Sequence, residues 1–125
     1  MISGNNPNLP VRYGASYKAN ALMAANTPSQ VVAPAANVNG VIILAAGFMS
    51  AAATTVGYSL IAKASAPANC IDGDVLLMPS MYNSVTQIVS GQLMRPVFVP
   101  PGLGVYFIRG DAETVANRYA LYSIL

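Results

Sequence analysis

The stretch NGVIILAAGFMSAAATTVGYSLIA, residues 39–62, decides the fold class of this chain. It carries no charged residue and exceeds the length of about 20 residues that an α-helix needs to cross a bilayer. The small-residue run SAAATT divides it, however, and over residues 56–64 the side chains alternate between two faces, which is typical of a half-buried strand. Lys63 stands alone, without the cluster of Lys and Arg that orients a membrane helix. We therefore predict two strands joined by a small-residue loop, with a membrane helix as the alternative.

The rest of the chain after residue 38 repeats this pattern of short apolar runs separated by turn residues. The turns include Pro100-Pro101-Gly102, in which Pro fixes φ and Gly supplies a positive φ, and Asp72-Gly73-Asp74. Several short strands at this spacing predict an all-β fold, either an antiparallel β-sandwich or a barrel. The predicted strands cover residues 41–49, 56–64, 74–78, 85–89, 93–99, 105–109 and 118–125.

Residues 1–37 differ from the rest because they are rich in Asn, Pro, Ala and Ser. Pro7, Pro10, Pro28 and Pro34 are spaced so that no long helix can run through this region. Residues 17–26 could form a short helical turn, but the region as a whole predicts an extended N-terminal arm. We therefore expect an arm over residues 1–37 and a β-sandwich domain over residues 38–125. The N-terminus shows no basic region followed by an apolar run, so we expect no secretory signal.

The composition limits the classes of partner that the protein can have. Of its 125 residues 54% are hydrophobic and 8% are charged, whereas a typical soluble domain carries about 25% charged residues. A surface with so few charges favours association with other proteins. The net charge of +2 comes from basic residues spread along the chain, so we expect no nucleic-acid partner. The single cysteine, Cys70, is expected to be a structural thiol rather than a reactive one.

Catalytic groups are scarce. The chain has no histidine, which removes the commonest general base and the commonest metal ligand. The carboxylates form two local pairs, Asp72 with Asp74 and Asp111 with Glu113, which we interpret as solvated turns rather than calcium ligands. We therefore expect no enzymatic activity, no cofactor and no metal. A small hydrolase or metal-binding protein is the least favoured reading, and bound metal or turnover in the purified protein would support it.

Two further features each have a functional and a structural interpretation. Arg109-Gly110-Asp111 matches the tripeptide that adhesion ligands present to integrins, but it follows an apolar run and is explained by a turn that ends a strand. The tyrosines could form a recognition surface, because Tyr is favoured at interfaces. For the tyrosines in predicted strands we expect core packing with the hydroxyl at its edge.

The order of several segments along the chain resembles that found in one protein family. The Asn- and Pro-rich arm is followed by NVNGVIILAAGFMSAAATTVGYSLIAKASAP, DGDVLLM, RPVFVPPGLGVYFIRGDAE and the terminal RYALYSIL. This order resembles the small virion proteins of tailed bacteriophages, particularly the capsid decoration or cement proteins with a jelly-roll-like β-sandwich. The resemblance covers residues 38–125 and rests on the order of strands and the PxGLGxYFI-like turn and strand, not on a catalytic signature.

The resemblance implies a structural virion protein that binds the outside of a phage capsid and reinforces it. It implies a homotrimer on the capsid surface, made in the host cytoplasm, with the arm lying over the major capsid protein and no membrane partner. A tail-fibre or receptor-binding sandwich that recognises the host surface is the alternative. The arm residues expected to contact the partner are Pro7, Pro10, Tyr13, Tyr17, Pro28 and Pro34.

Overall fold

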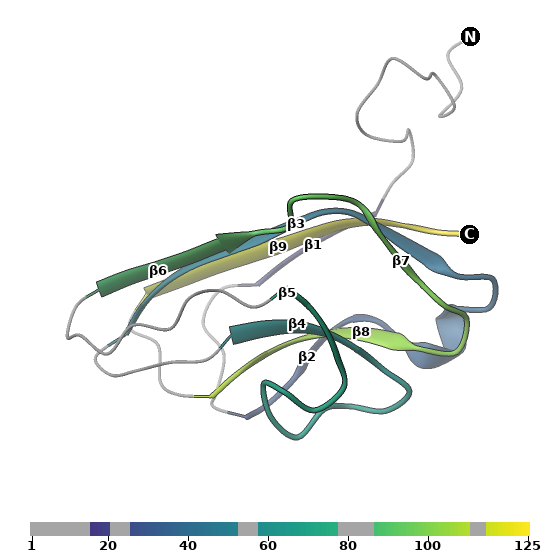
Figure 1. The fold of residues 1–125 in the computed structure, drawn as a ribbon, viewed down its shortest axis with the longest axis horizontal. Helices are drawn as coiled ribbons and strands as arrows, with labels where there is room; N and C mark the ends of the chain where they lie inside the picture. Colours follow the sequence, from purple (N-terminus) through teal and green to yellow (C-terminus); the bar gives the residue numbers. More distant parts are fainter. Residues whose placement is uncertain (1–15, 21–25, 53–57, 78–86, 111–114) are drawn as a thin grey trace, which may run out of the picture.

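The computed structural model of the chain describes residues 16–20, 26–52, 58–77, 87–110 and 115–125, and places them in two stacked antiparallel β-sheets (Figure 1). The prediction of an all-β sandwich is confirmed. The five-stranded sheet has the order β1-β9-β3-β6, with β7 also paired to β3. Its strands are β1 (Ser16–Asn20), β3 (Val41–Ala52), β6 (Gln87–Gln92), β7 (Val97–Val99) and β9 (Val115–Ile124).

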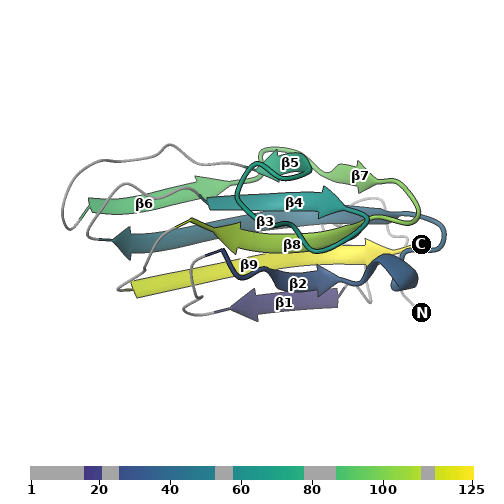
Figure 2. The same cartoon turned by 90° about the horizontal axis from the view of Figure 1, so that it is seen from below.

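The second sheet has four strands in the order β2-β8-β4-β5. They are β2 (Ser29–Val32), β4 (Tyr58–Lys63), β5 (Asp74–Leu77) and β8 (Gly104–Arg109), and a short 3-10 helix, η1 (Pro34–Ala36), follows β2. Figure 2 shows β1 along one side of the sandwich and β5 and β7 along the other.

The strand pairs are nested along the chain. β1 pairs with β9, β2 with β8, β3 with β6 and β7, and β4 with β5, so the outermost strands of the sequence pair first and the innermost last. Two further pairs, β3 with β9 and β4 with β8, join these hairpin-like units into the two sheets. Each sheet therefore contains strands from both halves of the chain.

The stretch at residues 39–62 forms β3 and β4, which lie in different sheets. The strand interpretation is confirmed, and the membrane helix considered for these residues is wrong. In the part of the chain that the structure describes, no helix combines the length and hydropathy needed to span a bilayer. The predicted small-residue loop at residues 53–57 lies outside the described residues.

The hydrophobic core lies between the two sheets and depends on a change of register within β3. The pairing of β3 with β9 shifts between Ile43 and Ala45, so that Leu44 is an extra residue. Because side chains alternate along a strand, one extra residue changes which positions face inward. Val41 and Ile43 are buried before the shift and Ala46 after it. The core cluster consists of Val31, Val32, Val41, Ile43, Ala46, Leu60, Ala62, Val99, Val105, Phe107 and Ala120.

The region predicted as an arm contributes two strands to the sandwich. β1 pairs with β9 over Ser16–Asn20, and β2 pairs with β8. A helical turn over residues 17–20 is therefore wrong, because these residues are extended in a sheet. Only residues 1–15 of the expected arm precede the first strand, and they lie outside the described residues.

One end of the sandwich is closed by the buried side chain of Asn37. Its Nδ2 donates to the carbonyl oxygens of Pro100 and Leu103 at 2.7 and 2.9 Å, and its Oδ1 accepts from the Gly40 N–H at 2.8 Å. The Gly102 N–H donates to the Asn37 carbonyl at 2.8 Å. Gly102 has a φ of 86°, as the predicted Pro-Pro-Gly turn requires. One amide side chain thus ties the segment before β3 to the turn between β7 and β8.

The outer face of the four-stranded sheet is covered by the segment between β4 and β5, residues 64–73, which we call the strap. Ile61 points away from the core cluster, yet it is fully buried. Gly73 lies so close to it that an added Cβ would be 2.7 Å from Ile61 Cγ2. The Ser59 hydroxyl, on the same face, donates to the Cys70 carbonyl oxygen. The strap therefore covers a second, smaller apolar surface outside the main core.

Candidate functional site

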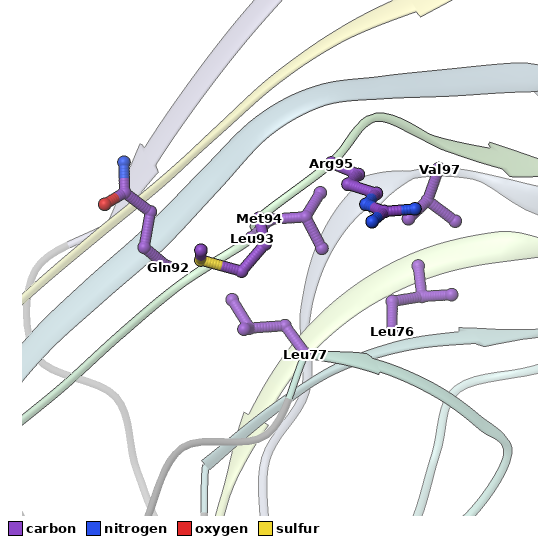
Figure 3. Close-up of a pocket in the computed structure, with 7 residues that line it drawn as sticks. All are labelled: Leu76, Leu77, Gln92, Leu93, Met94, Arg95 and Val97. Carbon is purple, nitrogen blue, oxygen red and sulfur yellow. The ribbon is translucent and has the colours of Figure 1, made fainter.

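A groove opens along the side of the sandwich where β5, β6 and β7 form the sheet edges. It encloses about 460 Å³. Figure 3 shows that β5 contributes one wall and that the chain from the end of β6 to the start of β7 contributes the other. We call it the edge groove, and its lining residues are Leu76, Leu77, Gln92, Leu93, Met94, Arg95 and Val97.

The edge groove exists because β6 and β7 pair with different parts of β3. β6 pairs with the second half of that strand and β7 with Val41–Ile43 at its start. Between them the Leu93 N–H still donates to the Ala46 carbonyl oxygen at 2.8 Å, and then the chain leaves the sheet. Pro96 has no N–H with which to continue a ladder. The segment from Leu93 to Pro96 therefore leaves the edge of β3 and forms one wall of the groove.

The walls of the edge groove are apolar, and one cation lies among them. Leu76, Leu77 and Leu93 are half-buried and pack against the core cluster. Met94 is 90% exposed. Arg95 is the charged residue of the lining, and its side chain is labelled in Figure 3. The polar groups of the lining are the amide of Gln92 and the guanidinium of Arg95, and the other lining side chains are apolar.

Another exposed apolar surface lies beside Gly40, just before β3. We call it the end patch, and it consists of Phe98 and Leu125, which both lie beside Gly40 and are exposed. Phe98 is 55% exposed although it lies in a strand. The Leu125 N–H donates to the Gly40 carbonyl oxygen at 3.0 Å, which holds the C-terminal residues beside the segment that precedes β3. Exposed apolar side chains in one place mark a surface that can contact another protein.

An ion pair joins the last residue of β4 to the strap. Lys63 Nζ lies 2.6 Å from Asp72 Oδ2, and this carboxylate also accepts from the Ala68 N–H at 2.8 Å. The hydrogen bond from Lys63 and the one from Ala68 lower the pKa of Asp72. Burial raises the pKa of the Cys70 thiol, as expected of a structural cysteine. Within the described ranges, no three His, Cys, Asp or Glu side chains gather as a metal site.

Arg109 of the Arg-Gly-Asp tripeptide is the last residue of β8 and is only 3% exposed. An integrin must reach the arginine of such a motif, and here the side chain lies in the interior. The prediction that a strand ends at this arginine is confirmed, while Asp111 lies outside the described residues. Arg118 is buried as well, so two of the six basic residues do not contribute to the surface.

The predicted core packing is confirmed for Tyr122, which packs against the core cluster. Tyr106 is buried in β8 but is not part of that cluster, because it pairs with Ile61 and alternates with the core residues Val105 and Phe107.

The arm residues predicted to bind a partner fall into two groups. Pro7, Pro10 and Tyr13 lie outside the described residues. Tyr17 lies in β1, in the five-stranded sheet, whereas half-buried Pro28 and Pro34 flank β2 in the other sheet. The described members do not form one surface, and their role in partner binding stays a prediction.

Sequence reasoning did not find the edge groove. The run LMRPVFV was predicted as one strand, whereas the structure has a break between β6 and β7. The signal was the dipeptide Arg95-Pro96, because a proline inside an apolar run marks an edge strand or an interruption.

The chain was compared with protein-family models, with curated proteins and with solved structures, and none of the three comparisons gave a match.

Proposed function

We propose that this protein is a structural component of a virion, with a jelly-roll fold. The observation that carries this proposal is the nested pairing of β1 with β9, β2 with β8, β3 with β6 and β7, and β4 with β5. A long hairpin with these pairs, rolled up so that β9 meets β3 and β8 meets β4, is a double-sheet jelly roll. Viral capsid domains are one of the groups that use this architecture, and lectin domains are another.

Within the virion we propose a decoration or cement role on the outside of a phage capsid. Such a protein must bind a preformed shell through neutral and complementary contacts, since burying unpaired charges is costly. The end patch offers two exposed apolar residues, Phe98 and Leu125, for such a contact. The low overall charge of the chain supports the same role.

We further propose that the residues before β1 contact the major capsid protein and that the protein acts as a homotrimer. A segment that orders on binding can cover a large surface at modest affinity per unit area. Many copies around one particle would then bridge neighbouring capsid subunits and reinforce the shell.

The test is co-sedimentation of the purified protein with capsids of its phage that lack it. The full chain should bind saturably, and a chain that begins at Ser16 should bind more weakly while keeping both β1 and β2. Asp substitution of Phe98 in the end patch should also weaken binding, whereas Asp substitution of the exposed Ile71 in the strap is the matched control. Absence of binding by the full chain would overturn the decoration role in favour of a tail-fibre module.

A further inference from the structure

We infer that the edge groove is the binding site for residues 9–13 of a second copy of this chain, which join copies head to tail. This inference rests on the homotrimer of the proposed function and deepens it, because it identifies the contact that joins the copies. It does not require a capsid. It names the segment that fills the groove and explains how the copies are joined.

The groove has the chemistry of a site for an extended apolar peptide. β5 pairs with β4, and none of the other described strands pairs with the outer backbone edge of Asp74–Leu77. Beside that edge stand Leu76, Leu77 and Leu93. An added strand gains affinity from backbone hydrogen bonds along such an edge and specificity from side chains that enter the adjacent pocket.

Residues 9–13, LPVRY, have the pattern that such a site would accept. Leu9, Val11 and Tyr13 alternate with Pro10 and Arg12. In an extended chain this spacing puts the three apolar side chains on one face and Arg12 on the other. Proline is tolerated in an edge strand when its missing N–H would have faced solvent, which holds for Pro10 if Leu9 and Val11 point their N–H groups at β5.

The groove of the same copy is out of reach for this segment. Ser16, Tyr122, Ile43 and Val97 form one row across the five-stranded sheet, each paired with the next. With strands about 4.8 Å apart, Ser16 lies about 14 Å from Val97 across the row. The three residues that connect Tyr13 to Ser16 span at most about 11 Å, and the path around the sheet is longer than the straight line. The occupant must therefore come from another copy.

This placement determines the kind of assembly. The donor segment precedes β1 in the chain, and the acceptor groove lies on the opposite side of the sandwich from β1, on the side of β5 and β7 (Figure 2). A contact between two different surfaces of identical subunits is heterologous, and it gives a closed ring when the rotation between copies closes. A trimeric ring would use every donor segment and every groove, so that of the residues before β1 only those outside the donor segment would remain for the proposed capsid contact.

The experiment measures the mass of the full chain in solution by light scattering after size exclusion. We compare the wild type with Val11→Asp in the donor segment and Met94→Asp in the groove. Met94 is 90% exposed, so its substitution should leave the fold intact, and circular dichroism checks this. Asn6→Asp and Ile71→Asp are the matched controls, one before the donor segment and one on the strap, where Ile71 is 74% exposed.

We expect an oligomeric wild type and controls, and monomers for both Val11→Asp and Met94→Asp. A monomeric wild type, or an oligomer that survives both substitutions, would overturn the inference. The result is independent of capsid binding, so it separates this inference from the decoration role.

A cross-linking experiment tests the same contact directly. Val11→Cys and Met94→Cys are made separately, each with Cys70→Ser, and the two proteins are mixed and oxidised. A disulfide-linked heterodimer should form in the mixture and not in either protein alone. Equal cross-linking within each separate protein would instead indicate a symmetric contact and contradict the head-to-tail arrangement.

Discussion

The chain segments before and after β7 differ in how firmly they are bonded to the rest of the sandwich. After β7, the turn at residues 100–103 is joined to Asn37 by several hydrogen bonds, and the amide side chain is fully enclosed. Before β7, the segment that begins at Leu93 has one backbone hydrogen bond to β3 and then leaves the sheet, and Met94 is almost entirely exposed. The turn after β7 is therefore fixed by contacts within the molecule, whereas the segment before β7 is left exposed.

The same contrast between a covered and an open apolar surface is seen when the strapped face of the four-stranded sheet is compared with the edge groove. Both Ile61 under the strap and the leucines of the edge groove are apolar side chains near a sheet surface. Ile61 is covered by the protein's own loop, which is anchored by Lys63 and Asp72. The groove leucines remain half-buried. Polar side-chain contacts thus hold both the closed end at Asn37 and the strap over Ile61. The described residues of one copy provide no such cover for the edge groove, and we propose that a second copy of the chain fills it.

The largest effect is expected from breaking the closed end. Asn37→Leu keeps the volume but removes three side-chain hydrogen bonds, and it leaves the buried Gly40 N–H and two partly buried carbonyl oxygens without this partner. We expect a loss of roughly 4 kcal/mol in the free energy of unfolding, measured by urea denaturation. Asn39→Leu is the control, because Asn39 is exposed and its bond to Leu125 is 3.4 Å long, so it should change stability by less than about 0.5 kcal/mol. Equal losses in the two variants would refute the role given to Asn37.

A smaller effect should separate the strapped face from the open groove. Ile61→Ala leaves a cavity beneath the strap and should cost about 3 kcal/mol in the free energy of unfolding. Met94→Ala, at the exposed side of the groove, should change it by less than about 0.5 kcal/mol in the monomer. The two values are compared under conditions in which both variants are monomeric. A costly Met94→Ala would mean that the groove is already closed within one copy.

The smallest effect on stability is expected from the ion pair between Lys63 of β4 and Asp72 of the strap. Its partners lower the folded-state pKa of Asp72 below the ordinary value of 3.8. A depressed carboxyl pKa stabilises the folded state above the unfolded value, and this contribution is lost as the pH falls through the folded pKa. The stability difference between wild type and Asp72→Asn should therefore be small and positive at pH 7, since exposed pairs contribute little, and should vanish on acidification. A difference that grows on acidification would contradict the assignment.

The sequence predicted the strands whose own pattern is strong and missed those defined by distant partners. β3, β4 and β8 are long apolar runs, and alternation together with turn residues was enough to locate them. β1 and β2 lie in a segment rich in Pro and Asn, whose composition favours neither strand nor helix. They are strands because β9 and β8, far along the chain, present edges to them. Tertiary pairing overrides weak local preference in such places.

The edge groove could not be predicted for a related reason. Its walls come from β5 and from the link between β6 and β7, and these are brought together only when each becomes the edge of a different sheet. The sequence indicated the break at Arg95-Pro96 but not the strand opposite it. The turn at Pro101-Gly102 was predictable, because its geometry depends on adjacent residues alone.

The nested pairing of strands has a consequence for how the molecule forms during synthesis. β9, whose ten residues lie between β1 and β3, is the last of the described strands to leave the ribosome. The four-stranded sheet can assemble before it, but β1 has no described partner until β9 arrives. Folds dominated by such distant pairs form slowly, in milliseconds to seconds for small domains. A chain interrupted before residue 115 would expose the unpaired edges of two strands, which makes it prone to aggregation and a target for quality control.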